Sequence, residues 1–305
     1  MPMSRAEWLE ERRHSIGGSD AAAVVGMNPY VTPYMLWADK TGRLPPKEDN
    51  EAMRQGRDLE WYVAQRFSEA TGKRVHTRNG LIRNPDYPFA HATIDRKVSG
   101  ERAGLECKTT SAMNLKRFNH GEYPEAYYAQ CVHYLAVTGF DRWYLAVLVF
   151  GQGFRWFTIE RDEGEIRALM EAEKAFWEQH VMKDVPPPVD GLDPTGTAIS
   201  AIYAEPEPGN TVELFDRETL IRDYLATKEL IRMYERENEA RKQRLQEDLG
   251  DAENGYAGKY AVIWKQQSRD SFDFDRFSED HPEIPLTPYY RTSTFRKFEV
   301  KEAKG

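Results

Sequence analysis

The segment at 91–108, HATIDRKVSGERAGLECK, constrains the fold of this chain more than any other. Ala92–Asp95 and Gly104–Lys108 are predicted to be strands, because turn-forming residues separate two runs of strand-type pattern. Side chains alternate between the two faces of a strand, so Glu106 and Lys108 should share one face and the apolar residues around them the other. The sequence therefore predicts a hairpin with one charged face.

Asp95, at the end of the first strand, is expected to lie beside Glu106, and adjacent carboxylates repel each other unless a cation lies between them. Carboxylate oxygens are preferred ligands of Mg²⁺, which takes the remainder from water and substrate phosphate. Lys108 could orient a metal-bound water or balance charge on a phosphate. The pattern indicates metal-assisted phosphodiester hydrolysis, and the alternative from these residues alone is a surface hairpin with an ordinary ion pair.

The composition excludes several classes of protein. With 40% hydrophobic and 30% charged residues, the chain is typical of a globular protein, and its net charge of -8 argues against nonspecific coating of DNA. A nuclease with a local basic channel stays open. No apolar run approaches the roughly 20 residues of a membrane span, and the first residues lack the apolar core of a secretory signal. Cys107 and Cys131 are too few for a four-cysteine metal site, and reduced thiols predict a cytoplasmic protein.

Residues 15–26 form a second informative segment, SIGGSDAAAVVG. Two glycines, a Ser-Asp pair, an apolar run and a closing glycine predict a short helix with an open N-terminus. Backbone N–H groups at such an end favour an anion. One interpretation is a DNA phosphate held by Arg12, Arg13 and Ser19, and the other is an ordinary capped helix.

Two predicted helices could bring further polar groups to the hairpin. Apolar residues recur at helical spacing over 51–71 and 125–137. Glu60 is either a solvated flank residue of the first helix or, if that helix packs behind the hairpin, a third carboxylate. Gln130 is the polar residue of the strongly apolar second helix, so it either bonds to core backbone or faces the carboxylates.

The order of predicted elements is helix, about three strands, helix, two strands and helix, which is typical of a mixed α/β core. The early strands include a predicted pair at 74–76 and 81–83, and the strand at 142–150 is apolar enough for burial on both faces. Residues 1–183 are expected to hold this core.

The rest of the chain is expected to divide in two. Residues 184–211 are rich in proline and glycine and predict a connector. Residues 212–305 predict a long charged helix with a coiled-coil-like seam, followed by a two-stranded unit made by 260–266 and 292–300. This tail is either an oligomer or protein-partner surface, or an α/β appendage packed on its own core.

Five short motifs occur in order: IGGSDAAAVVGMNPY at 16–30, GRDLE at 56–60, ATIDR at 92–96, LECK at 105–108 and YYAQCVHYL at 127–135. With them the chain resembles the YqaJ-like viral recombinase family of phage exonucleases, related to lambda exonuclease within the PD-(D/E)XK nuclease superfamily. The resemblance spans about 12–160 and implies a restriction-endonuclease-like α/β core, in which helices flank a central mixed sheet. A C-terminal α+β appendage with a long helix lies beyond it.

The resemblance implies a role for each matching residue. Asp95 and Glu106 match the metal-binding acids, and Lys108 matches the lysine of the ExK motif. Glu60 and Gln130 match the acid and the glutamine that the flanking helices bring to the same site. All five are therefore catalytic candidates, and the three acids are candidate metal ligands.

Three further residues complete the implied site. The backbone carbonyl of Cys107 is a candidate metal ligand. Ser19 and Arg12 match the positions that hold the 5′-phosphate of the DNA, and Arg13 is the alternative to Arg12.

The resemblance also implies an enzymatic activity. Its members degrade linear duplex DNA from 5′ ends and pass the single strand to an annealing protein, which implies a 5′→3′ deoxyribonuclease using Mg²⁺, with Mn²⁺ as a substitute. The implied location is the cytoplasm of a bacterial host of a phage or prophage, and the implied assembly is a homo-oligomer such as the ring-shaped trimer of lambda exonuclease. The alternatives are a structure-specific endonuclease on the same fold and a non-catalytic DNA-binding or assembly protein.

Overall fold

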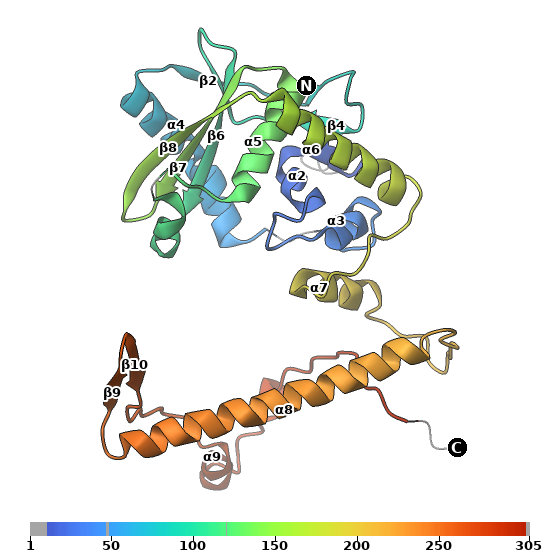
Figure 1. Ribbon diagram of the computed structural model, residues 1–305, viewed down its shortest axis with the longest axis vertical. Helices are drawn as coiled ribbons and strands as arrows, with labels where there is room; N and C mark the ends of the chain where they lie inside the picture. The colour runs from blue at the N-terminus through green and yellow to red at the C-terminus, as the bar shows by residue number, and fades with distance from the viewer. Residues whose placement is uncertain (1–10, 47–48, 120, 303–305) are drawn as a thin grey trace. The chain divides into compact units, whose positions relative to one another are not determined.

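The computed structural model describes residues 11–46, 49–119 and 121–302, and the chain forms two compact units that meet in sequence at Tyr203 and Ala204 (Figure 1). The first unit is a mixed α/β structure, as expected. Among the described residues, no helix is long and apolar enough to cross a membrane.

The main sheet of the first unit has five strands in the order β2-β5-β6-β7-β8. β6 and β7 run parallel and the other neighbours are antiparallel, so the predicted mixed sheet is confirmed. The strands are β2 (Val75–Thr77), β5 (Arg96–Val98), β6 (Ala103–Thr110), β7 (Arg142–Val149) and β8 (Gly153–Glu160).

Both faces of this sheet are covered by helices. The 21-residue helix α4 (Glu51–Thr71) packs Val63 and Phe67 against Leu105 of β6. The opposite face packs against α5 (Glu125–Thr138), and α2 (Gly18–Val24) and α6 (Glu163–Phe176) both pack on α5 (Figure 1). The apolar strand β7 is buried on both sides, as its sequence predicts.

A small second sheet lies beside the first. It has the order β1-β4-β3, with β1 (Ile16–Gly17) parallel and β3 (Ile82–Arg83) antiparallel to β4 (Ala90–Ala92). The predicted strand Ala92–Asp95 is therefore wrong in its bounds, because β4 ends at Ala92 and β5 begins after Asp95. The linker between these two strands passes from one sheet to the other.

The predicted pairing of 74–76 with 81–83 is also wrong, because β2 pairs with β5 and β3 pairs with β4. Strands of two or three residues carry too little pattern to specify a partner, and packing against the core decides.

Part of the predicted connector is ordered. Residues Asp193–Ile202 form helix α7, which packs on α3 (Pro33–Lys40). The Thr195 and Thr32 hydroxyls are hydrogen-bonded at 2.7 Å, and Ala198 is fully buried. The connector therefore contributes a helix to the first unit.

The second unit contains the predicted long helix, α8 (Glu218–Leu249), a hairpin and the short helix α9 (Phe274–Asp280). The hairpin pairs β10 (Tyr260–Ile263) with β9 (Asn254–Ala257), so the predicted pairing of 260–266 with 292–300 is wrong. Gly258, at φ 58°, allows a tight turn between β9 and β10. Closing this local turn costs less chain entropy than closing a loop to residue 292.

Candidate active site

A cavity of about 180 Å³ opens between α2, α5, the end of β4 and the middle of β6. It brings together five of the residues singled out from the sequence. The first and last of these, Arg12 and Gln130, are more than a hundred positions apart in the chain. The residues that line it are Arg12, Gly17, Gly18, Ser19, His91, Thr93, Asp95, Glu106, Gln130 and Tyr134.

Asp95, Glu106 and Gln130 line one half of the cavity, and Lys108 contacts two of them from outside the lining. Lys108 Nζ donates to Glu106 Oε1 at 2.6 Å and to Gln130 Oε1 at 2.9 Å, and Gln130 Nε2 donates to Glu106 Oε1 at 2.8 Å. The Cys107 backbone N–H donates to Asp95 Oδ2 at 2.8 Å. The predicted common face of Glu106 and Lys108 is confirmed, and Gln130 faces the carboxylates rather than the core backbone.

The acidic side chains in this half of the cavity shift the pKa values of Asp95 and Lys108. Burial raises the pKa of Asp95 well above its usual range, and the charges of Glu106 and Glu60 raise it further. Burial acts to lower the pKa of Lys108, but the charges of Glu106 and Asp95 outweigh it and raise that pKa. Lys108 is therefore a firmly held ammonium group, whereas the ionised form of Asp95 is disfavoured by burial and by its carboxylate neighbours.

Glu60 lies close enough to influence Asp95, but its side chain forms an ion pair with Arg96. In the described parts of the chain, no group of three or more His, Cys, Asp and Glu side chains is arranged to hold a metal ion. The expected third carboxylate is thus held by Arg96, a residue that the sequence reasoning missed although it follows Asp95 directly in the ATIDR motif.

The two remaining carboxylates fit a hard divalent cation. Glu106 is 3% exposed, and its Oε2 atom is buried with no hydrogen-bond partner among the described residues. A buried carboxylate oxygen without a donor is costly, and a cation shared with Asp95 would remove both this cost and the repulsion between the two acids. Burial and the Asp95 charge raise the pKa of the Cys107 thiol, so its side chain stays a neutral thiol.

The other half of the cavity holds the predicted anion-binding residues. Arg12 Nη2 donates to Ser19 Oγ at 2.7 Å and to Asp20 Oδ1 at 3.4 Å. Of the two adjacent arginines, Arg12 lines the cavity. Thr93 joins them there, and its Oγ1 atom is buried with no hydrogen-bond partner within the described residues. The sequence reasoning missed Thr93, which sits inside the ATIDR motif.

A buried lysine holds this half in place. Lys40 Nζ donates to the Arg12 carbonyl at 2.6 Å, the Ser15 carbonyl at 2.9 Å and Asp20 Oδ2 at 2.6 Å. The Gly17 N–H also donates to Asp20 Oδ2, at 3.0 Å. Burial acts to raise the pKa of Asp20, but Lys40 and Arg12 outweigh it and hold that pKa below its usual range. The sequence gives no sign of Lys40, because its partners come from other elements.

Two histidines support the strand that precedes Asp95. His91 Nδ1 lies 2.8 Å from Ser15 Oγ, and burial together with the Lys40 charge lowers the pKa of His91 to about 3. His133 Nε2 donates to the His91 carbonyl at 2.9 Å, and its Nδ1 lies 2.8 Å from Glu173 Oε1. His91 is therefore neutral at the cavity wall, and a fully buried His–Glu pair ties α5 and α6 to β4.

Close packing also explains a glycine of the GGSD motif. A Cβ atom at Gly18 would lie 2.4 Å from Tyr134 Cε1, closer than any real contact. The glycine lets α2 approach α5, and Tyr134 OH accepts a hydrogen bond from Gln130 at 2.8 Å.

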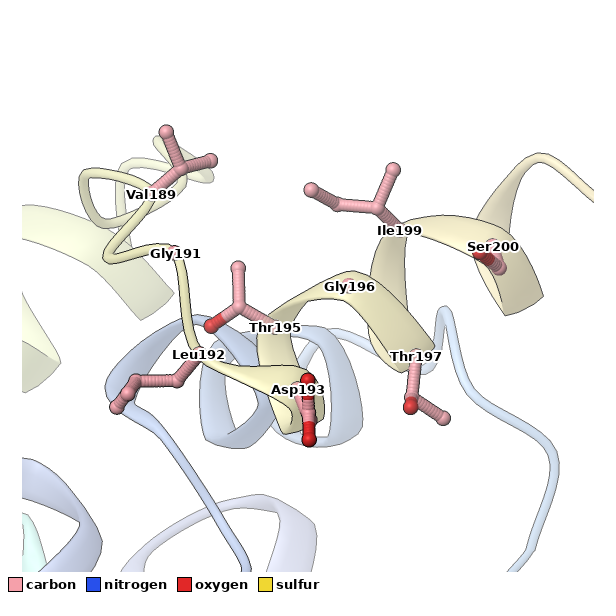
Figure 2. A pocket seen from close by; sticks show the side chains of 9 residues that line it. All are labelled: Val189, Gly191, Leu192, Asp193, Thr195, Gly196, Thr197, Ile199 and Ser200. Carbon is pink, nitrogen blue, oxygen red and sulfur yellow. The ribbon is translucent and has the colours of Figure 1, made fainter. Parts of the chain in front are cut away.

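A separate hollow lies along α7 (Figure 2). Its lining is largely apolar or hydroxylated, with Asp193 as its single titratable side chain. This lining lacks a second group for acid–base or metal chemistry. It comprises Val189, Gly191, Leu192, Asp193, Thr195, Gly196, Thr197, Ile199 and Ser200.

The comparison with known proteins identifies the family. The family model described as the YqaJ-like viral recombinase domain matches residues 7–141. The protein named "Uncharacterized protein YqaJ" from Bacillus subtilis (strain 168) is 38% identical over 305 residues, which cover 98% of this chain and 95% of that protein. This chain belongs to the YqaJ-like viral recombinase family. The resemblance drawn from the five motifs is confirmed.

Solved structures show more distant similarity. An alkaline exonuclease from Laribacter hongkongensis is 22% identical, with a TM-score of 0.49 over 59% of this chain and 94% of that one. A phage-related exonuclease from Haemophilus somnus 129PT is 12% identical, with a TM-score of 0.41 over 58% of this chain and 99% of that one.

Proposed function

We propose that this chain is a metal-dependent deoxyribonuclease that degrades the 5′-ended strand of linear duplex DNA and leaves single strands for recombination by annealing. The observation that carries the proposal is one cavity with two chemically different halves. Asp95 and Glu106 line the half suited to a cation, with Lys108 bonded to Glu106 beside the lining, and Arg12 and Ser19 line the half suited to an anion. A phosphodiester substrate with a terminal phosphate needs both kinds of group.

The carboxylate half is proposed as the cleavage site of a PD-(D/E)XK core. Asp95 and Glu106 would hold Mg²⁺ or Mn²⁺, the Cys107 carbonyl is a further candidate ligand, and Glu60 could join if it leaves Arg96. A bound divalent ion polarises the scissile phosphate and lowers the pKa of an attacking water.

Lys108 is proposed as a hydrogen-bond donor rather than a general base. Its pKa is raised, so the amine keeps its proton at neutral pH. Glu106 and Gln130 fix the ammonium group from two sides, at 2.6 and 2.9 Å. In this position it can orient a water and balance charge on the phosphate in the transition state.

The other half is proposed as the 5′-phosphate pocket. The Arg12 guanidinium and the Ser19 hydroxyl are charged and neutral donors suited to phosphate oxygens, and the unpartnered Thr93 hydroxyl adds a third. The family name, viral recombinase, and the exonuclease neighbours support the same substrate class. A single-strand annealing protein is the proposed partner that receives the product.

The test is digestion of a linear duplex labelled separately at each 5′ and 3′ terminus, with Mg²⁺ and with a chelator. We expect early, metal-dependent loss of the 5′ label, and none with Lys108→Ala. Lys174→Ala, which removes an exposed lysine from α6, is the matched control and should cleave normally.

Other outcomes would assign other functions. Cuts in a covalently closed circular duplex would show a structure-specific endonuclease on the same core. Retained DNA binding with no metal-dependent cleavage would show a non-catalytic DNA-binding or assembly protein and would overturn the proposal.

A further inference from the structure

Helix α8 (Glu218–Leu249) carries a long stripe of uncovered side chains. All 32 of its residues are described, and none is buried. Leu220 and Tyr234 are each 60% exposed, Ile231 is 52% exposed and Leu245 is 47% exposed. Alternating spacings of four and three place the stripe at the a and d positions of a coiled-coil heptad. Its members are Leu220, Tyr224, Thr227, Ile231, Tyr234, Asn238, Arg241 and Leu245.

The second unit covers the flank of this stripe more than its centre. Ile221 and Leu225 on the flank are half-buried. Within the stripe, the Tyr224 ring contacts the Phe298 ring in an edge-to-face arrangement, with ring centroids 5.9 Å apart. The remaining apolar residues of the stripe stay exposed, which is costly for a helix in water unless another surface covers them.

A second copy of α8 running parallel does not fit the stripe. In a parallel pair each a or d residue faces the same residue of the other copy. Arg241, at a d position, would then face Arg241 of the second copy in the seam. Two guanidinium groups in the seam repel each other and lose water, and the ion pair of each Arg241 with Glu237 of its own helix, at 3.0 Å, leaves this repulsion across the seam.

An antiparallel copy places compatible apolar residues opposite each other. In an antiparallel coil an a residue faces a d residue of the other copy. With the two helices fully overlapped, Leu220 faces Leu245 and Ile231 faces Tyr234 of the second copy. Each pairing occurs twice, because a two-fold axis relates the copies.

The polar positions of the stripe also match in this direction. Tyr224 faces Arg241 of the second copy, where a guanidinium can stack on the aromatic ring. Thr227 faces Asn238 of the second copy, and the two side chains can share a hydrogen bond. Arg241, which disfavours a parallel pair, therefore has a partner in an antiparallel one.

The flanking charges agree with the same alignment. Asp223 lies opposite Arg244 of the second copy, and Lys228 lies opposite Glu235 of the second copy. Both pairs are attractive, and symmetry repeats each of them.

We propose that two copies of this chain associate through α8 as an antiparallel two-stranded coiled coil with Leu220 opposite Leu245. This association uses the second unit alone, goes beyond the proposed nuclease activity and does not depend on it.

Cysteine cross-linking of the full chain tests the direction. Leu220→Cys and Leu245→Cys proteins are oxidised separately and as a mixture, with the unsubstituted chain as control for Cys107 and Cys131. We expect a covalent dimer in the mixture and not in either protein alone. Cross-linking of either variant with itself beyond the control would show a parallel pair and overturn the proposal, as would no cross-link in any sample.

Charge reversal tests the alignment by sedimentation of the full chain over a range of concentrations. Asp223→Lys should weaken dimerisation about tenfold or more, because the introduced ammonium group would face Arg244 in both halves of the interface. Adding Arg244→Glu should restore it. Glu229→Lys makes the same charge change on the far side of α8 and should leave association unchanged. No rescue by Arg244→Glu, or equal weakening by Glu229→Lys, would exclude this alignment.

Discussion

Asp95 lines the cavity and Asp20 lies behind Arg12 and Ser19, and these two aspartates are held in opposite ways. Asp20 accepts hydrogen bonds from Lys40, Arg12 and the Gly17 N–H, and its pKa is lowered. Asp95 accepts one backbone hydrogen bond and is surrounded by other carboxylates, and its pKa is raised well above the usual range. Burial alone therefore does not decide the charge state of an aspartate; its neighbours do.

This difference suggests that Asp20 has a structural role and Asp95 a role in the proposed reaction. The ion pair of Asp20 with Lys40 is complete within the protein and shapes the segment that presents Arg12 and Ser19. The pair of Asp95 and Glu106 lacks such partners, and the proposed cation would supply the missing charge. Loss of a charge should therefore lower the free energy of unfolding at the Asp20–Lys40 pair but not at Asp95.

The largest expected effect is on cleavage. Asp95→Asn and Glu106→Gln should each lower the rate of 5′-label release about a thousandfold or more, or about 4 kcal/mol in activation free energy. Asp95→Asn should not lower the melting temperature without metal, because it removes a buried repulsive charge. Normal cleavage by either variant would remove these two residues from the proposed site.

Breaking the ion pair of Asp20 with Lys40 should lower the free energy of unfolding. Lys40→Met leaves Asp20 buried and without its main partner, so the free energy of unfolding should fall by about 3–5 kcal/mol. Urea denaturation measures it, with Lys174→Met as the matched surface control. A change below about 1 kcal/mol would mean that the supporting role assigned to Lys40 is wrong.

Divalent cations that bind Asp95 and Glu106 should stabilise the folded chain. Binding to the folded chain alone raises the free energy of unfolding by about 2.7 kcal/mol when the ion is at a hundred times its Kd. Mg²⁺ should therefore raise the melting temperature of the wild type and of Lys40→Met, but not that of Asp95→Asn with Glu106→Gln. An equal rise in the doubly substituted protein would place the ion elsewhere.

The smallest effect is a pH dependence that comes from Asp20. Its folded-state pKa lies below the ordinary value of 3.8, so its ionised form contributes stability above that value, which is lost as the pH falls below it. The free energy of unfolding should thus fall more steeply for wild type than for Asp20→Asn below about pH 4. Parallel curves for the two proteins would contradict the assigned pKa shift.

Much of the site could be predicted because it depends on local pattern. The two-residue period of a strand puts Glu106 and Lys108 on one face whatever packs against them. The bounds of α4 match the prediction at 51–71, because Asn50 caps its start and Gly72, at φ 71°, ends it. The order of the five motifs was sufficient to indicate the family.

The tertiary structure decided which segments and charges are partners. Periodicity tells which face of a segment is buried but not what covers it, so β2, β3 and β10 were assigned the wrong partners. The ion pairs of Lys40 with Asp20 and of Glu60 with Arg96 join residues 20 and 36 positions apart. Such contacts form only when packing brings their elements together, and the low dielectric of the interior then gives each charge its effect. Sequence alone therefore predicted Asp95, Glu106, Gln130, Arg12 and Ser19 as groups of the candidate site. The fold added Thr93, Lys40 and Arg96 and determined which side chains have partners within the protein.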